Sequence, residues 1–221
     1  MNQNELRTSE IVFILDKSGS MHAVTEDTIG GFNSTLQEQQ AASAGGYLTT
    51  ILFDNHISTL HDRLPLKDVQ PLTTKEYRAS GCTALLDAIG TTIRHIEQVH
   101  HYIRQEDVPE KTLFVIMTDG LENASHSFTG DQVRGMIDEK QKAGWEFVFL
   151  GANIDAVEAA SRIGIDEEHT ANFHQDEEGI DLAFKSVNGF LNSRRMMSAP
   201  MEATGDWKQS VESDFNSRKK R

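Results

Sequence analysis

The stretch Ile11-Val-Phe-Ile-Leu-Asp16-Lys-Ser18-Gly-Ser20-Met21 is an apolar run that ends abruptly in an acid and two hydroxyl side chains. A short, continuous apolar run of this kind predicts a strand that is buried on both faces. A polar loop that directly follows such a strand is a common place for functional side chains. We therefore take this stretch as the first strand of a parallel sheet and as the first part of a functional site.

Two further stretches also place polar or small residues next to an apolar strand or helix pattern. Leu113-Phe-Val-Ile-Met-Thr118-Asp119-Gly120 is a second apolar strand that ends in an acid followed by glycine. Ser80-Gly-Cys-Thr83-Ala84 is a loop of small residues ahead of a helical pattern. In an open α/β sheet, loops at the carboxyl ends of neighbouring strands converge on one crevice. The sequence therefore predicts that these three loops meet.

The rest of the chain alternates between strand and helix patterns. The segment 25–28 predicts an N-cap at Thr25 and an acidic first turn for a helix with Ile29, Phe32 and Leu36 on its buried face. The strands predicted at 47–53 and 57–60 flank Asp54-Asn55 as a hairpin, which predicts one antiparallel edge strand. Alternation of this kind predicts an α/β fold: a doubly wound, mostly parallel central sheet with helices on both faces, of Rossmann-like type.

The later elements are predicted in chain order from apolar periodicity and from capping signals. They are a helix over 84–102, the strand that ends at Asp119, a helix that opens with a capping box at Thr129–Gln132 and ends at Gly144, a strand over 147–150, a helix over 154–163, a short strand over 169–173 and a helix over 180–191.

Composition limits the class of protein. The 221 residues are 38% hydrophobic and 25% charged, which is typical of a globular chain, and no apolar run has the length needed to span a bilayer. Cys82 is the single cysteine and the N-terminus has no apolar signal-type segment, so we expect cytoplasmic residence and no membrane association. We interpret Cys82 as a packed thiol rather than a nucleophile.

Charge and periodicity also divide the chain. Residues 193–221 carry a net charge of +3 and the remaining residues −16. An acidic body of this kind should repel nucleic acid. We predict an N-terminal extension (1–9), one α/β domain (10–192) and a polar, basic C-terminal tail (193–221) that is either mobile or a short helix around 207–215. Trp207 either anchors this tail on the body or contacts a partner.

The pattern Asp16-x-Ser18-x-Ser20, then Thr83, then Asp119 resembles the metal-ion-dependent adhesion site of von Willebrand factor type A domains. Glycines 81 and 120 also stand where that family usually has glycine. The resemblance spans roughly residues 10–191. Three segments are similar to small stand-alone A-domain proteins of bacteria and phages, namely Thr28-Ile-Gly-Gly-Phe-Asn33, Ala84-Leu-Leu-Asp-Ala-Ile-Gly90 and Leu150-Gly-Ala-Asn153.

The resemblance implies a divalent cation held by these five residues. It implies Ser18, Ser20 and Thr83 as direct hydroxyl ligands, and it leaves open whether Asp16 and Asp119 bind directly or through water. Hard cations prefer oxygen ligands of this kind, so Mg²⁺ is expected, with Mn²⁺ or Ca²⁺ as substitutes. In the family, the coordination sphere is completed by an Asp or Glu carboxylate of a protein partner. We therefore expect an intracellular protein-binding module rather than an enzyme.

Adjacency in the sequence places a second group of residues at the rim of this site, where they would contact the partner. They are Lys17, Met21, His22, Cys82, Leu121, Glu122 and Asn123. The oligomeric state and the identity of the partner are left open.

Two alternative functions remain. Asp16 at a strand end is similar to the nucleophile of Mg²⁺-dependent phosphotransferases and phosphatases of the haloacid dehalogenase type. Those enzymes need a second acid two residues later, and Ser18 stands there in this chain. The other alternative is a subunit whose metal is purely structural and whose partner contacts lie elsewhere.

Overall fold

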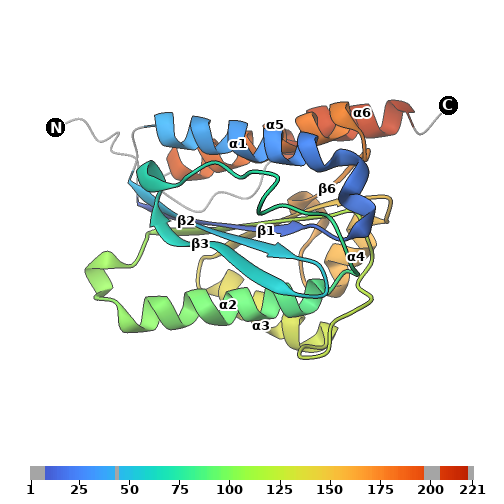
Figure 1. The fold of residues 1–221 in the computed structure, drawn as a ribbon. Helices are drawn as coiled ribbons and strands as arrows, with labels where there is room; N and C mark the ends of the chain where they lie inside the picture. Colours follow the sequence, from blue (N-terminus) through green and yellow to red (C-terminus); the bar gives the residue numbers. More distant parts are fainter. Residues whose placement is uncertain (1–7, 43–44, 197–204, 219–221) are drawn as a thin grey trace.

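The computed structural model describes residues 8–42, 45–196 and 205–218, and these residues form a six-stranded sheet. The strand order is β3-β2-β1-β4-β5-β6, with β3 antiparallel to β2 and every other neighbouring pair parallel (Figure 1). The strands are β1 (Ser9–Asp16), β2 (Gly46–Phe53), β3 (Ile57–Pro65), β4 (Lys111–Thr118), β5 (Glu146–Ala152) and β6 (Thr170–Phe173). The predicted doubly wound sheet with one antiparallel edge strand is confirmed.

The central strands are buried on both faces, as the continuous apolar run predicts. All eight residues of β1 are buried. Because side chains alternate across a strand, Ile11 and Phe13 pack in one core cluster while Val12 and Ile14 pack in the other. The sheet therefore separates two hydrophobic cores, and each core needs a layer of helices to cover it.

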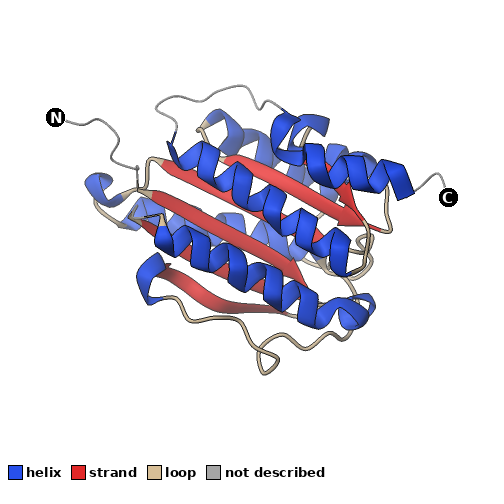
Figure 2. Cartoon of the chain, turned by 90° about the horizontal axis from the view of Figure 1, so that it is seen from above, coloured by secondary structure: helices blue, strands red, loops and turns tan. Residues whose placement is uncertain are grey.

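The two helix layers follow from this division. The first layer holds α1 (Thr25–Ala41), α5 (Glu177–Met196) and α6 (Gln209–Arg218), and the second holds α2 (Leu85–Tyr102), α3 (Gly130–Lys142) and α4 (Ala156–Arg162) (Figure 1). Figure 2 looks down on the first layer, with the strands beneath it. The sheet therefore lies between two layers of helices (Figure 1).

The two glycines of α1 give a prediction about the contact between α1 and α5. A Cβ atom on Gly31 would lie 2.2 Å from the ring of Phe184 in α5, whereas a Cβ on Gly30 would meet nothing within 4 Å. We expect Gly31→Ala to destabilise the protein by about 1–3 kcal/mol, because the packed core has no room for the methyl group. Gly30→Ala should instead stabilise it by about 0.5–1 kcal/mol through helix propensity. Urea unfolding of both variants checks this pair, and effects of the same sign would contradict it.

The predicted N-cap at Thr25 is wrong. Residues Gly19–Val24 form a 3₁₀ helix (η1) that runs directly into α1, so the N-cap position is Val24, which makes no side-chain cap. The Thr25 hydroxyl instead donates to the carbonyl of Met21 at 3.3 Å. Because η1 already forms the preceding turn, the first turn of α1 is not exposed for Thr25 to cap.

The other local predictions agree with the structure. The hairpin turns at Asp54 and joins β2 to β3. Both hydrogen bonds of the capping box are present, since Thr129 accepts from the backbone of Gln132 and the Gln132 side chain accepts from the backbone of Thr129. Gly144, after α3, has φ = +89°, a backbone conformation that glycine adopts without strain. The helix predicted over 180–191 is longer at both ends, as α5.

The C-terminal segment contains the helix α6, which packs on α5 and β6. Trp207 precedes it, and its indole N–H donates to the carbonyl of Glu168 at 3.0 Å while its ring lies edge-on to Phe190. In the structure, Trp207 therefore anchors this segment on the body. The boundaries 1–9, 10–192 and 193–221 stay predictions, and residues 1–7, 197–204 and 219–221 lie outside the described residues.

Candidate metal centre

The candidate centre lies at the carboxyl ends of β1 and β4, which are adjacent in the sheet. From this point the chain turns in opposite directions, because β1 leads through α1 to β2 on one side and β4 leads through α3 to β5 on the other. Such a switch point opens a crevice between the loops. Asp16 is the last residue of β1, and Asp119 directly follows Thr118, the last residue of β4.

The side-chain oxygens of three of the five predicted ligands, Ser18, Ser20 and Asp119, contact one another directly. The Ser20 hydroxyl donates to Asp119 Oδ1 at 2.7 Å, although the two residues are 99 positions apart in the sequence. Ser18 Oγ lies 3.5 Å from the same Asp119 atom and 3.2 Å from Ser20 Oγ. The three oxygen atoms are close enough together to surround one small ion.

Asp16 is the fourth member of the set and is only 1% exposed. Its Oδ1 accepts the backbone N–H of Ser18 at 2.7 Å, and its Oδ2 accepts the hydroxyl of Thr118 at 2.6 Å. The Tyr77 hydroxyl donates to the Asp16 backbone carbonyl. The Asp16 carboxylate thus orients the loop that carries Ser18 and ties it to the end of β4.

Thr83, the fifth member, lies on the loop before α2 and is 3% exposed. A Cβ atom on Gly120 would lie 3.1 Å from Thr83 Oγ1, so this hydroxyl faces the backbone that follows β4. The Thr83 loop is tied to the first loop by the Gly19 N–H, which donates to the carbonyl of Gly81 at 3.1 Å. Within the described residues the Thr83 hydroxyl makes no hydrogen bond, which leaves this oxygen available to a cation.

The electrostatics of the site favour a cation. Burial raises the pKa of Asp16 to about 6 and raises that of Asp119 as well. In the part of the chain that the structure describes, no Lys or Arg pairs with either carboxylate, and the neighbouring Lys17 donates to Asp54 instead. Two buried carboxylates without a positive partner are costly, and a dication would offset that cost.

The donor set fits a hard dication, since it offers only oxygen atoms. No group of three or more His, Cys, Asp or Glu side chains that could hold a metal occurs among the described residues. A centre at this position therefore depends on the serine and threonine hydroxyls. These are neutral ligands, so within the set only the carboxylates of Asp16 and Asp119 offset the charge of the ion.

Four of the predicted rim residues differ in exposure. His22 is exposed, and Leu121 is 58% exposed. Cys82 is an exposed free thiol, so the interpretation of Cys82 as a packed thiol is wrong: it lies on the loop before α2, where Ser80 and Gly81 are exposed as well. Met21 is only 3% exposed and belongs to the core cluster on the α1 side of the sheet. Its side chain is covered because η1 turns it inward, so we do not carry Met21 into the proposed contact surface.

The other three rim residues hold the loops together. The Glu122 carboxylate accepts the backbone N–H of Leu86 at 2.8 Å and so links the loop after β4 to the start of α2. Asn123 Oδ1 accepts the backbone N–H of Thr83 at 2.9 Å. Lys17 pairs with Asp54, which holds the pKa of Asp54 below its usual range despite its burial. A contact of these three side chains with a partner stays a prediction.

No sequence motif points to Gln175, which lies between β6 and α5. Its amide nitrogen donates to Asp119 Oδ2 and, at 2.8 Å, to the backbone carbonyl of Ser20. Its carbonyl oxygen accepts from the side chain of Asn153. Gln175 therefore holds the outer oxygen of Asp119, so that the other oxygen faces the hydroxyls of Ser18 and Ser20.

Comparisons with known proteins agree with this architecture. No protein-family model and no curated protein matches the sequence. Among solved structures, the vWF domain of the type V pili tip protein Mfa5 from Porphyromonas gingivalis superposes with a TM-score of 0.63 at 11% identity, over 90% of this chain and 99% of that one. Proximal thread matrix protein 1 from the mussel byssus, with a zinc-occupied MIDAS motif, gives a TM-score of 0.56 at 14% identity, over 85% of this chain and 47% of that one.

A third similar structure is the pilus adhesin SpaC from Lactobacillus rhamnosus GG, with a TM-score of 0.63 at 12% identity. The match covers 85% of this chain but only 30% of the adhesin, so this chain corresponds to one part of that protein. The chain therefore has the fold of a von Willebrand factor type A domain. None of these three neighbours is described as an enzyme.

Proposed function

We propose that this chain is a protein-binding module that holds Mg²⁺ between Asp16, Ser18, Ser20, Thr83 and Asp119 and takes up an Asp or Glu carboxylate of its partner. The observation that carries this proposal is the convergence of the Ser18 and Ser20 hydroxyls on Asp119, at the switch point of the sheet. The lack of a basic partner for the two carboxylates among the described residues supports it. Mn²⁺ and Ca²⁺ are suitable substitutes because oxygen ligands discriminate weakly among hard ions.

The ligand chemistry explains why an outside carboxylate would bind. Two carboxylates at most neutralise a dication, and any water between Asp16 or Asp119 and the ion weakens that neutralisation. A bound ion then supplies local positive charge on a body that is otherwise acidic. Because residues 1–192 carry a net charge of −16, long-range attraction does not guide an acidic partner to this surface. We therefore expect the cation itself to carry the attraction.

The phosphotransferase alternative has less support. A nucleophilic Asp16 would need an accessible carboxylate oxygen, but Asp16 is 1% exposed and both of its oxygens accept hydrogen bonds. Ser18, at the position of the second acid, points its hydroxyl at Asp119. A purely structural metal remains the other alternative, and the partner experiment below separates it from the binding module.

Affinity capture from an extract of the source cells tests the proposed function. The wild-type protein should retain partner proteins in Mg²⁺ and release them in EDTA, while Asp119→Ala should retain none in either buffer. Partners that stay bound in EDTA would favour the structural metal. Release of phosphate from simple phosphate esters by the wild type, but not by Asp16→Asn, would favour the enzyme.

Gln175 gives a separate prediction about cation affinity. Partners that orient a ligand from outside the coordination sphere typically contribute a factor of about 10 to 100 in metal affinity. We expect Gln175→Ala to weaken Mg²⁺ binding about tenfold, because Asp119 is then free to rotate. Isothermal titration measures the Mg²⁺ affinity of the variant. Gln141→Ala is the control, because the Gln141 side-chain amide donates a hydrogen bond to the Gly164 carbonyl, away from the site. Equal affinities for the two variants would contradict the assigned role.

The cellular location stays a proposal. None of the helices formed by the described residues has the length and apolar character needed to cross a bilayer. We propose a cytoplasmic location, supported by the single cysteine. A bacterial or phage origin is likewise supported only by the sequence segments that resemble those proteins.

A further inference from the structure

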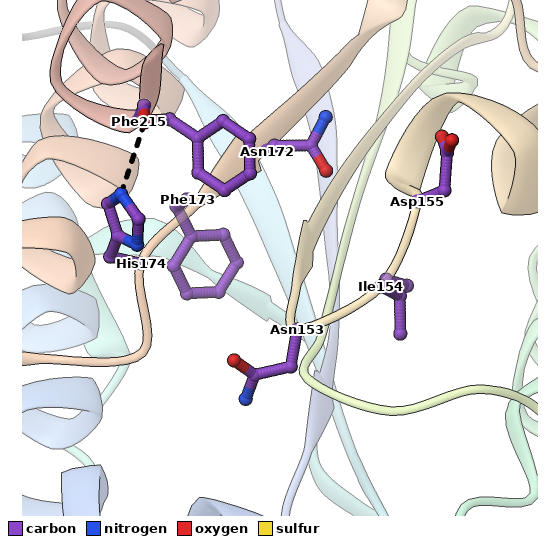
Figure 3. A pocket seen from close by; sticks show the side chains of 7 residues that line it. All are labelled: Asn153, Ile154, Asp155, Asn172, Phe173, His174 and Phe215. Carbon is purple, nitrogen blue, oxygen red and sulfur yellow. Dashed lines mark hydrogen bonds between the residues drawn. The ribbon is translucent and has the colours of Figure 1, made fainter. Parts of the chain in front are cut away.

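A pocket of about 370 Å³ lies beside the metal centre, at the carboxyl ends of β5 and β6. We call it the side pocket, and Figure 3 shows the side chains that line it: Asn153, Ile154, Asp155, Asn172, Phe173, His174 and Phe215. Its walls come from the loop between β5 and α4, from the end of β6 and from α6. Ligand pockets span about 300–1,000 Å³, so this pocket, at the low end of that range, suits a group of the size of one large side chain.

A single residue, Gln175, connects the side pocket to the metal centre. The side-chain amide of Asn153, which lines the pocket, donates to Gln175, and Gln175 donates in turn to Asp119. Gln175 also contacts the backbone of Ser20, which belongs to the predicted ligand loop. A single short segment of a partner can therefore reach the cation and the side pocket together.

The side pocket has an aromatic side and an acidic side. The rings of Phe173, His174 and Phe215 gather on one side in Figure 3, and the centroids of His174 and Phe215 are 4.8 Å apart. The carboxylate of Asp155 lies on the opposite side of the view. Aromatic faces attract cations and pack well against aliphatic chains.

The polar groups of the side pocket leave acceptors available. Asp155 Oδ1 accepts the backbone N–H of Glu158 at 3.0 Å, which leaves the second carboxylate oxygen without a contact among the described residues. Asn153 uses its amide nitrogen on Gln175, so its carbonyl oxygen remains an acceptor. The seven lining residues include no Lys or Arg, so no basic side chain of the pocket pairs with Asp155. An aromatic surface combined with an unpaired carboxylate fits a basic side chain.

We propose that the side pocket receives a Lys or Arg side chain of the same partner that places its carboxylate on the cation. The aliphatic stem would pack on the partly exposed rings of His174 and Phe215, because Phe173 is only 1% exposed, and the charged end would pair with Asp155. This inference rests on the proposed function for the carboxylate, but the pocket itself uses none of the five metal ligands. The partner would therefore be a segment that carries one acidic and one basic side chain a short distance apart.

Synthetic peptides test the pairing. We would use acetylated, amidated five-residue peptides with a central Asp and one Arg at each other position in turn, each matched by a peptide with citrulline, the uncharged analogue of Arg. In Mg²⁺, one Arg position should give about tenfold tighter binding than its citrulline match, the sum expected of one exposed ion pair and one cation–π contact. Asp155→Asn should remove this advantage while it preserves Mg²⁺-dependent binding, because Asn also caps a helix.

The control variant is Asp166→Asn. Asp166 likewise accepts a backbone N–H, that of His169, but it precedes β6 and so lies at the opposite end of that strand from the side pocket. It should keep the full preference for Arg. Equal binding of Arg and citrulline peptides to the wild type, or an Arg preference that survives Asp155→Asn, would overturn the proposal.

A second measurement separates this inference from the metal hypothesis. In EDTA, N-acetyl-arginine amide at millimolar concentration should shift the side-chain amide NMR signals of Asn153 and Asn172, and N-acetyl-citrulline amide should not. Such shifts in a protein that binds no Mg²⁺ would support the side pocket and reject the metal centre. Unchanged amide signals, in a protein whose Mg²⁺ binding is normal, would reject the side pocket alone.

Discussion

Asp119→Ala is expected to abolish Mg²⁺ binding, with a loss of affinity greater than about 100-fold, beyond the range that outer-shell residues produce. Asp119 accepts from Ser20 and Gln175 and sits where three loops meet. Its removal takes away one of the two charges that face the ion. The fold should persist, because burial already disfavours the charged carboxylate, as its raised pKa indicates.

Asp16→Ala should lose binding to a similar extent but at a larger cost in stability. The backbone N–H of Ser18 would lose its acceptor inside the protein, since Ser18 is 2% exposed. An unsatisfied buried donor costs about 1–3 kcal/mol. Isothermal titration with Mg²⁺ and urea unfolding in EDTA measure the two effects separately.

Asp62→Ala is the matched control, because Asp62 lies on the outer strand β3 and is paired with His95. It should bind Mg²⁺ as the wild type does. If both Asp16→Ala and Asp119→Ala bound Mg²⁺ with wild-type affinity, neither residue would belong to the ligand set, and the proposed function would lose its basis.

The second large effect is expected at Asp87 in α2. Its carboxylate accepts three backbone N–H groups, from His126, Ser127 and Phe128, each at 2.9 Å. It therefore fixes the loop between β4 and α3 against α2. We expect Asp87→Ala to destabilise the protein by about 3 kcal/mol, because hydrogen bonds to a charged acceptor are strong and their donors would be left without it. Urea unfolding at neutral pH measures the loss.

The pH dependence of this effect follows from the pKa of Asp87. Burial would raise that pKa, but the three N–H donors outweigh burial and bring it below the usual 3.8. A depressed pKa in the folded state gives stability that is present above 3.8 and is lost as the pH falls through the folded value. The difference in stability between the wild type and Asp87→Ala should therefore shrink in acid. If the difference in unfolding free energy between the wild type and Asp87→Ala were the same at pH 7 and pH 3, it would contradict this account.

The role of Asp87 cannot be predicted from the local sequence. The segment Ala84-Leu-Leu-Asp-Ala-Ile-Gly90 resembles a segment of small stand-alone A-domain proteins, and this resemblance assigns no role to its acid. The three N–H donors lie about 40 positions later. A carboxylate that serves a distant loop has the same local pattern as one that faces water, so periodicity does not distinguish the two.

Each of the five predicted ligands belongs to a local pattern that the sequence shows directly. Asp16 and Asp119 each follow a buried strand, and Thr83 opens a helix. Their meeting point follows from the rule that loops at the carboxyl ends of adjacent parallel strands converge. Adjacency in the sequence predicts Met21 at the rim, but adjacency does not show which way η1 turns this side chain, which is only 3% exposed.

The amino-acid sequence by itself determined the type and order of the elements, the antiparallel hairpin and the local patterns in which the five predicted ligands lie. These depend on apolar runs, turn residues and caps within a few positions of one another. Only the tertiary structure decided that β1 lies beside β4, that Gln175 reaches Asp119, and that α6 closes a pocket next to the centre. Those contacts join residues that are far apart in the chain, and packing of the whole sheet and both helix layers sets them.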